Sequence, residues 1–338
     1  MEEDRINQLP DEILVHILSF IDSYEAFETT FLSKRWKNLW RSLPSLRLHL
    51  SSAASSDFVS HFLSHRDATA PVHSLNLSLD DKFNLKLVNK CVLYAINHGV
   101  QSLRLRAYNT HLRLPAALFT STTLCELELK LFNNNVTRAP GRLLLPNLKT
   151  LFLEAHSTFD DDTGMETFAG LPGLEKLTLR GRPFTSLVLK APKLRVLEIL
   201  QYSRSMEEIS APLLTSFRFE GFSPLECSMM NLPMLEQVYV DIYNIGYNVK
   251  KLHRMLHQLG NATNVSLTLD TLKVLELDDG PIEQSPPPFP NLKCLKVMKG
   301  HYKIRTVLQS VMNYLTIGTL YFEKVEFPDG VTVVEKNM

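Results

Sequence analysis

One apolar phrase recurs along most of this 338-residue chain and restricts its fold more than any other feature. The phrase reads L-x-x-L-x-L, with other apolar residues allowed at each leucine position. Its copies begin at Val72, Val100, Leu124, Leu148, Leu174, Leu194, Leu214, Leu235, Asn264, Leu292 and, as a last possible copy, Ile317. Successive copies start 20 to 29 residues apart, a period that is typical of stacked repeats. The chain is therefore predicted to be a stack of units rather than a fold around a single globular core.

Each copy has the pattern of a short strand with one buried face. A single strand of this kind cannot bury its apolar edge alone, so the units are predicted to stack into a parallel sheet. The segments between copies must return along the other side, and three of them read as helices, at residues 55 to 67, 84 to 99 and 248 to 260. The last two end in Gly99 and Gly260, which suit helix C-caps. Units of about 20 residues have room only for a turn or an extended return.

Residues 264 to 277 contain two overlapping copies that cannot both be strands. One begins at Asn264 and the other at Leu272, only eight residues later. We assign the strand to residues 264 to 269, because that choice leaves even spacings on both sides. The segment TLKVL is then expected on the outer side of the sheet.

The first 50 residues lack the repeat and have a helical pattern. Apolar residues at positions 13, 14, 17, 18 and 21 fall on one helix face, after Pro10 and two carboxylates in the first turn. A second apolar set from Ala26 to Leu43 also has helical spacing, so two or three short helices are predicted. So small a bundle buries too little surface to be secure alone, which implies a partner.

Charge and cysteine content exclude several classes of protein. Lys plus Arg equals Asp plus Glu at 36 each, so no overall field attracts nucleic acid or an acidic membrane. Cys91, Cys125, Cys227 and Cys294 lie far apart, which fits free thiols in the cytoplasm or nucleus better than a disulfide framework. The N-terminus is acidic where a signal peptide is basic, and no apolar run of about 18 residues occurs, so no membrane segment is predicted.

The repeats resemble those of leucine-rich-repeat proteins, with one departure. The common pattern places Asn or Cys three residues after the second strand leucine. This chain instead has Tyr108, Phe132, His156, Arg182, Tyr202, Phe222 and Tyr243 there. An irregular solenoid is therefore expected, in which packing of these mostly aromatic groups holds the turn.

The N-terminal segment resembles an F-box. Leu9-Pro10, Ile13-Leu14, Ile17-Leu18, Ile21 and the run from Leu32 to Trp36 match its order and spacing. Together with the repeats, they make the whole chain similar to plant-type F-box/leucine-rich-repeat proteins. The resemblance implies an α+β fold by modules, with a helical F-box at residues 3–50 and an α/β solenoid with a curved parallel sheet at residues 51–338.

In that family the F-box docks on the Skp-type adaptor of an SCF cullin-RING ubiquitin ligase, and the repeats hold a substrate protein. Carried over by position, the resemblance implies an adaptor-binding set of Leu9, Pro10, Ile13, Leu14, Ile17, Leu18, Ser33, Lys34, Arg35 and Trp36. The alternative for each of these residues is that it holds the small bundle together. Trp40 and Leu43 are expected to pack the F-box against the first repeat, with residues 43 to 50 supplying an edge strand.

The substrate is expected on the strand face of the solenoid, where residues alternating with the buried leucines point together. These residues are Arg104, Arg106, Glu126, Glu128, Lys130, Phe152, Glu154, Lys176, Arg180, Glu198, Arg218, Glu220, Tyr239 and Asp241. Their signs alternate between neighbouring strands. Cross-strand ion pairing and a binding face are therefore equally open interpretations.

No catalytic site, metal site or cofactor is predicted. The run Asp160 to Gly164 lacks the apolar strand that should precede it in a phosphoryl-transfer enzyme. The histidine pairs at 61 and 65, and at 253 and 257, lack an H-E-x-x-H glutamate and a third ligand. No nucleophile elbow, P-loop or dinucleotide-binding glycine pattern occurs either.

Three functions remain open. The first is a non-catalytic substrate receptor of the ligase, and the second is a scaffold that binds the adaptor without ubiquitylation of its cargo. The third is a nucleic-acid binder through residues 34 to 41, where two tryptophans lie among four cations. It is the least favoured, because residues 1 to 50 carry eight acidic residues against six Lys and Arg.

Overall fold

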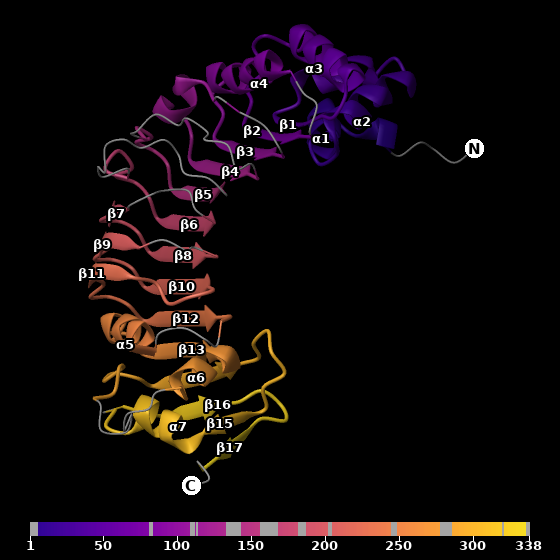
Figure 1. The fold of residues 1–338 in the computed structure, drawn as a ribbon. Helices are drawn as coiled ribbons and strands as arrows, with labels where there is room; N and C mark the ends of the chain where they lie inside the picture. The colour runs from indigo at the N-terminus through magenta and orange to yellow at the C-terminus, as the bar shows by residue number, and fades with distance from the viewer. Residues whose placement is uncertain are drawn as a thin grey trace. The chain divides into compact units, whose positions relative to one another are not determined.

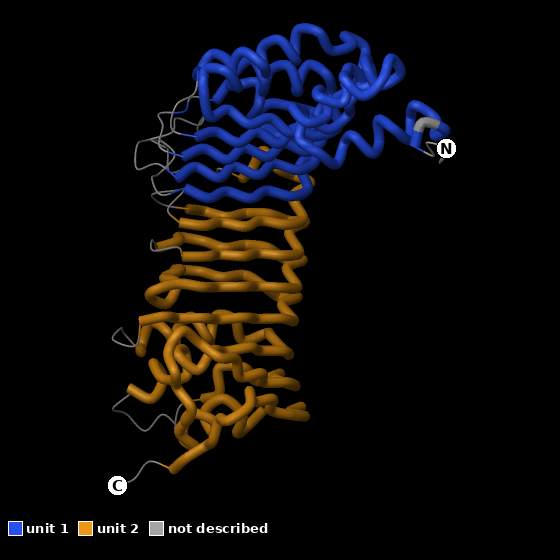
Figure 2. The backbone as a smooth tube through the Cα atoms, turned by 90° about the vertical axis from the view of Figure 1, so that its right-hand side faces the viewer, with its two compact units in different colours: residues 1–160 blue, residues 161–338 orange. Residues whose placement is uncertain are grey.

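The computed structural model describes most of the chain. The described residues are 6–80, 84–108, 112, 114–132, 143–155, 168–181, 187–201, 205–244, 249–277, 286–319 and 321–335. They belong to two compact units, residues 1–160 and residues 161–338, which Figure 2 shows in different colours. Each unit is described separately below.

Unit 1 begins with a cluster of short helices. These are η1 (Ile6–Gln8), α1 (Asp11–Leu18), α2 (Ser23–Glu28), η2 (Thr29–Phe31) and η3 (Trp36–Ser42), of which the η elements are 3-10 helices. The predicted first helix is shorter than the apolar pattern, because α1 ends before Ile21. Asp22 then caps α2 by accepting from the Tyr24 backbone N–H at 2.8 Å, so the chain must already have turned.

A parallel sheet, with five strands among the described residues, follows in unit 1 (Figure 1). Its strands are β1 (Ser45–Leu50), β2 (Ser74–Leu79), β3 (Ser102–Ala107), β4 (Glu126–Leu131) and β5 (Thr150–Ala155). The predicted register is confirmed, since Leu75 of β2 lies opposite Leu103 of β3 and the strand leucines are buried. The predicted edge strand is confirmed as β1, which pairs Leu46 with Leu75.

Helices return the chain between the first strands. Two of them, α3 (Ala53–His65) and α4 (Leu85–Asn97), were expected, whereas the 3-10 helix η4 (Ala116–Thr120) was not. Gly99 ends α4 in the left-handed region at φ +78°, and its N–H donates to Ile96 O at 3.1 Å. The next N–H, of Val100, donates to Ala95 O at 3.0 Å, which completes the predicted glycine cap.

Unit 2 continues the repeat with a seven-stranded parallel sheet among its described residues. Its strands, in spatial order, are β6 (Lys176–Gly181), β8 (Val196–Leu200), β10 (Ser216–Gly221), β12 (Gln237–Ile242), β13 (Asn264–Thr268), β14 (Cys294–Met298) and β16 (Lys324–Glu326). In the units of about 20 residues, the return is extended, as expected. It forms a second parallel sheet from β7 (Val188–Lys190), β9 (Met206–Ser210) and β11 (Cys227–Asn231).

Three helices and a small third sheet complete unit 2. The helices are α5 (Val249–Gln258), α6 (Leu269–Leu275) and α7 (Gln309–Thr316), and β15 (Thr306–Leu308) pairs with β17 (Thr332–Val334). Gly260 follows α5 as predicted, but it does not have a positive φ. A Cβ there would lie 2.9 Å from Pro288 O, so close approach of the backbone accounts for this glycine.

Two predicted registers near the C-terminal end are wrong. The strand at residues 264–268 is confirmed, but Val265 and Leu267 face inward, opposite Leu295 and Val297. The predicted pair, Leu267 and Leu269, is therefore shifted by two residues, because the small Ala262 occupies the leading position. TLKVL belongs to the helix α6.

The last copy is also misplaced. Val325 of β16, rather than Leu320, lies opposite Leu295. Leu320 itself is outside the described residues, and Phe322 precedes the strand. The helix α7 ends at Thr316, and the chain joins the sheet only at Lys324, where β16 begins.

Candidate functional site

The helix α1 separates its apolar residues into two faces. Asp11 and Glu12 lie in its first turn, where carboxylates favour the helix dipole, and the N–H groups of Ile13 and Leu14 donate to Pro10 O. Leu14 and Leu18 are buried, at 0% and 2% exposure. Ile13 and Ile17 are each 44% exposed, four residues apart on the other face. The predicted adaptor-binding residues of α1 thus lie in two environments, one buried and one exposed to solvent.

The segment from Ser33 to Trp36 holds the N-terminal helices together. Trp36 is buried in η3, at 8% exposure, which the prediction of an adaptor-facing tryptophan did not anticipate. The Arg35 guanidinium pairs with Asp11 at 2.7 Å and donates to the Leu9 backbone oxygen. Arg35 therefore ties η3 to the start of α1 across 24 residues.

The remaining predicted residues of this set differ in exposure. Pro10 and Lys34 are exposed, whereas Leu9 and Ser33 are half-buried. The structure thus leaves Pro10, Ile13, Ile17 and Lys34 accessible, and it places Leu14, Leu18 and Trp36 inside the bundle.

Sequence reasoning missed three strongly exposed apolar side chains in the same segment. Phe20 is 62% exposed, Phe31 is 84% exposed and Leu32 is 69% exposed. Single exposed apolar residues are common on protein surfaces, but several large ones within one short segment of the sequence favour an interaction site. The available signal was the bulk of Phe31 beside Leu32 in a segment with a helical apolar pattern.

Trp40 joins the N-terminal helices to the first repeat, as predicted. Its ring lies 5.2 Å from the Phe27 ring of α2 and 5.1 Å from the Phe62 ring of α3. The Arg47 N–H of β1 also donates to the Ser23 hydroxyl at 3.0 Å. The helical segment and the beginning of the sheet therefore share one core, to which the buried Leu43 contributes.

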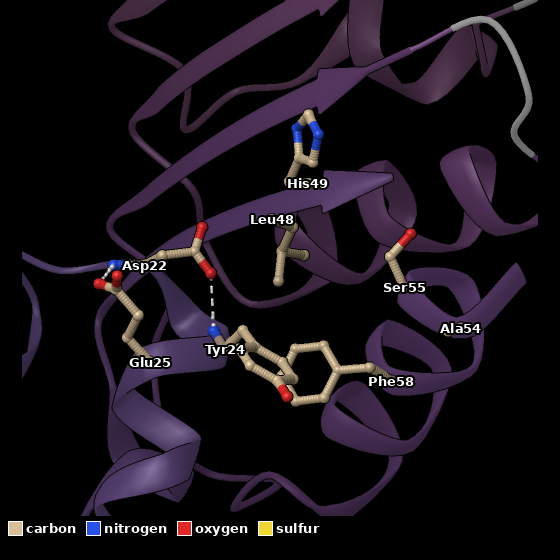
Figure 3. A pocket seen from close by; sticks show the side chains of 8 residues that line it. All are labelled: Asp22, Tyr24, Glu25, Leu48, His49, Ala54, Ser55 and Phe58. Carbon is tan, nitrogen blue, oxygen red and sulfur yellow. Dashed lines mark hydrogen bonds between the residues drawn. The ribbon is translucent and has the colours of Figure 1, made fainter. Parts of the chain in front are cut away.

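A pocket of about 560 Å³ opens beside this joint, between α2, β1 and α3 (Figure 3). The Tyr24 and Phe58 rings lie edge to face, 5.0 Å apart, along one side. Asp22 and Glu25 lie at one end, but both carboxylates already accept backbone hydrogen bonds in the cap of α2. Burial raises the pKa of Asp22, and the bond from the Tyr24 N–H partly offsets that effect. The hydrogen bonds of these carboxylates therefore cap α2.

On the strand face of unit 1, several predicted substrate residues bind one another. Glu128 pairs with Arg104 at 3.5 Å and with Lys130 at 2.5 Å. The Lys130 ammonium also lies 4.8 Å from the centre of the Phe152 ring. The remaining predicted residues of this unit are Glu126, which accepts from the Ser102 hydroxyl, Glu154, which is buried, and Arg106, which is exposed.

The strand face of unit 2 has the same character. Lys176 pairs with Glu198 at 3.5 Å, and Arg218 pairs with Glu220. The Arg218 guanidinium also lies 4.2 Å from the centre of the Tyr239 ring. Arg180 is half-buried and lies opposite Leu200. Pairing between strands, as in Lys176–Glu198, and within a strand, as in Arg218–Glu220, thus accounts for much of the charge on this face.

Asp241 belongs to a buried polar cluster at the end of β12. It accepts a hydrogen bond from the Thr268 hydroxyl at 2.8 Å and lies 3.3 Å from His301 Nε2. Burial raises the pKa of Asp241, while Thr268 and His301 act in the opposite direction.

The aromatic positions after the strands pack as predicted where they are described. The Tyr108 and Phe132 rings stack 4.7 Å apart in unit 1, and Phe222 and Tyr243 meet edge to face in unit 2. The other three positions, 156, 182 and 202, lie outside the described residues.

The searched parts of the chain contain no cluster of three metal-ligating side chains. The His61 and His65 rings lie 3.9 Å apart on α3, and His253 of α5 bonds to the Tyr314 hydroxyl at 2.7 Å. The run Asp160 to Gly164 is outside the described residues. Among the described helices, none is long and apolar enough to cross a membrane.

Two family models match the chain. The F-box domain matches residues 6–48, and the leucine-rich repeats of the FBD-associated F-box protein At5g56370 match residues 90–297. The second match alone covers more than half of the chain.

Similar curated proteins come from Arabidopsis thaliana. The putative F-box/LRR-repeat protein At3g42770 is 29% identical over 80% of this chain and 56% of its own length. The FBD-associated F-box protein At5g60610 is 30% identical over 71% of this chain and 64% of its own length. F-box/LRR-repeat protein At5g02910 is 28% identical over 92% of this chain and 69% of its own length. The chain thus spans less than two thirds of the length of the first two of these relatives.

Proposed function

The chain belongs to the F-box/leucine-rich-repeat proteins, and we propose on that premise that it is the substrate-recognition subunit of an SCF-type cullin-RING ubiquitin ligase. The F-box would dock a Skp-type adaptor, and the repeats would bind a protein destined for ubiquitylation. The observation that carries the proposal is the exposed apolar surface within the segment that matches the F-box.

We propose that the adaptor contacts the exposed side chains of this segment, which are Ile13, Ile17, Phe20, Phe31 and Leu32. Buried apolar anchors supply most of the free energy of typical protein interfaces. The buried members of the predicted set, Leu14, Leu18 and Trp36, would support the surface from below rather than contact the adaptor.

The proposed mechanism is proximity. A receptor that holds a substrate near an activated ubiquitin raises the effective concentration of the substrate's lysines and supplies no nucleophile of its own. The chain would therefore be a non-catalytic subunit that needs no metal or cofactor. Its four cysteines are free thiols, which favours the reducing environment of the cytoplasm or nucleus.

We propose residues 3–50 as the F-box and residues 51–338 as the substrate-binding repeats. The strand β1 then lies at the end of the F-box while it pairs with the first repeat strand. On the repeats, the strand-face residues of each unit, Arg104 to Glu154 in unit 1 and Lys176 to Asp241 in unit 2, remain the proposed surfaces for the substrate.

The adaptor interface can be tested by measuring the affinity of the purified chain for a Skp-type adaptor. The double variant Ile13→Asp, Ile17→Asp places two charges on the exposed face of α1, and we expect the affinity to fall by about tenfold or more. Leu213→Asp is the matched control. Leu213 is also an exposed aliphatic side chain, with 41% of its surface exposed, but it lies in unit 2.

The control variant should bind the adaptor like the wild-type chain. Unchanged far-ultraviolet circular dichroism would show that the double variant is folded. Undiminished adaptor binding by a folded double variant would overturn the proposed interface.

A further inference from the structure

The segment from 291 to 320 differs in charge from the rest of the chain. It contains no Asp or Glu, but it contains Lys293, Lys296, Lys299, Lys303 and Arg305, although the whole chain has equal numbers of acidic and basic residues. Residues 299–305 connect β14 to β15, and we call them the basic loop. Lys299, Lys303 and Arg305 of this loop are all exposed, as are His301 and Tyr302.

The cations of the basic loop differ from those of the strands. On the strand faces, Arg104, Lys176 and Arg218 each pair with a carboxylate. The side chains of Lys299, Lys303 and Arg305 make no ion pair and no hydrogen bond with any residue that the structure describes. Among the described residues, these three neighbouring positive charges have no partner, so they are available to a molecule that binds the loop.

A buried carboxylate holds the middle of the basic loop. Asp270 of α6 has no exposed surface, and it accepts from the His301 N–H at 2.5 Å and from the Tyr302 N–H at 3.3 Å. A Cβ on Gly300 would lie 2.3 Å from this carboxylate, so glycine is needed there. Burying a carboxylate is costly unless its hydrogen bonds are made, which fixes the loop against α6.

Further bonds hold the rest of the loop. The His301 ring lies 3.3 Å from Asp241 on the proposed substrate face, which connects the loop to β12. At the other end, the Thr332 N–H donates to Arg305 O at 2.9 Å, and the Leu308 N–H donates to Glu276 at 3.0 Å. The three free cations therefore stand on a pre-organised backbone, which lowers the entropy cost of binding.

We infer that the basic loop is a docking site for an acidic, Asp- and Glu-rich stretch of the substrate protein. This inference rests on the proposed function, since it assigns a chemical class to the partner of the repeats. Unpaired cations steer an oppositely charged partner and fix its register. A nucleic acid is less suited, because it needs a track of cations along successive phosphates, and the neighbouring Lys296 and Lys324 both contact Glu326.

The test measures binding of a fluorescein-labelled peptide of about ten residues, most of them Glu, to the full chain by fluorescence anisotropy. Replacing Lys299, Lys303 and Arg305 together by Gln should weaken binding by about tenfold or more. The matched control replaces Lys193, Arg195 and Lys250 by Gln, which removes the same charge from exposed positions of the same unit. This control should bind within about twofold of the wild-type chain.

A second variant tests whether binding depends on the position of the basic loop as well as on its charge. Gly300→Ala keeps every cation but places a methyl group against the Asp270 carboxylate, so it should also weaken peptide binding. If that variant fails to fold, the triple variant alone decides the question, because the three side chains that it replaces are exposed and have no partner in the part of the chain that the structure describes.

Several results would overturn the inference. One is equal binding of a peptide with Gln in place of Glu, and another is equal loss of affinity in the control triple variant. Binding confined to a phosphorylated peptide, or tighter binding of a single-stranded DNA of equal charge, would also contradict it. The adaptor affinity of the triple variant should equal that of the wild-type chain, so this inference and the proposed function can fail separately.

Discussion

Burial decides the role of individual residues in the F-box segment. Ile13 and Leu14 are neighbours with the same apolar character, but Ile13 is exposed and Leu14 is completely buried. The apolar period of the sequence predicted the helix correctly. It could not predict which face the helix packs, because Leu14 and Leu18 face other helices that are themselves amphipathic. The hydrogen bond from Arg35 to the Leu9 carbonyl could not be predicted either, since it joins residues 26 positions apart.

This division predicts losses of stability of very different size for two neighbouring substitutions. Leu14→Ala should lower the free energy of unfolding by about 2–5 kcal/mol, because it removes buried methyl groups and leaves a cavity. Ile13→Ala should change it by less than about 1 kcal/mol, because its side chain is already partly in water. Urea denaturation of both variants measures the difference. Equal losses of stability would show that the two faces of α1 are wrongly assigned.

The four cysteines should differ in reactivity towards iodoacetamide in the native chain. Burial raises the pKa of Cys91 to about 12 and also raises the pKa of Cys227, and both side chains are buried. The thiolate is the reactive form, so these two should be alkylated slowly and with little acceleration up to about pH 9. Cys125 and Cys294 are more exposed and should react first. Peptide mass spectrometry after timed alkylation measures this order, and early modification of Cys91 would contradict it.

At the scale of elements, the repeat predicted most strands because each inward leucine pair has a fixed two-residue spacing. The repeat predicted the wrong register where a small residue stands in place of a leucine, as Ala262 does before β13. It also failed where a helix intervened, as α7 does before β16. The three-stranded sheet of returns was expected only as extended chain, since its strands have no repeated apolar phrase.

The packing of α5 against α7 makes stability depend on pH. Tyr314 is buried, and its hydroxyl bonds to His253 at 2.7 Å and lies 3.4 Å from His257 Nε2. Burial, followed by the nearby His253, lowers the pKa of His257 from its ordinary value of 6.5. The unfolded chain therefore takes up a proton at His257 first as the pH falls, and stability present above pH 6.5 is lost below it.

The substitution His257→Gln should remove this contribution. Between about pH 7.5 and about pH 5.5, the urea midpoint of the wild-type chain should fall more than that of the variant. Glutamine at this position still offers a polar group to Tyr314, so the comparison isolates the proton. A variant whose midpoint falls as steeply as that of the wild-type chain would contradict the lowered pKa.

At the scale of the whole molecule, the sequence supported a division of labour between a helical segment and a set of repeats. The joint at Trp40 could be predicted because this aromatic residue lies at the end of the helical pattern, just before the first strand. The basic loop could not be anticipated as a site, because its rigidity depends on Asp270, a carboxylate whose burial no local pattern indicates. On the strand face, several charged side chains form ion pairs with one another. The sequence alone could not decide between such pairing and a binding surface.

The proposed delivery of bound proteins to a ubiquitin ligase can be tested in cells by proximity labelling. The wild-type chain and the Ile13→Asp, Ile17→Asp variant, each fused to a proximity-labelling enzyme, are expressed in cells that lack the endogenous protein. Labelled proteins and their abundances are then quantified with and without a proteasome inhibitor. The account predicts proteins that both forms label, whose abundance falls with the wild-type chain, recovers with the inhibitor and does not fall with the variant. Proteins labelled by both forms at abundances that never change would contradict the account and indicate a scaffold.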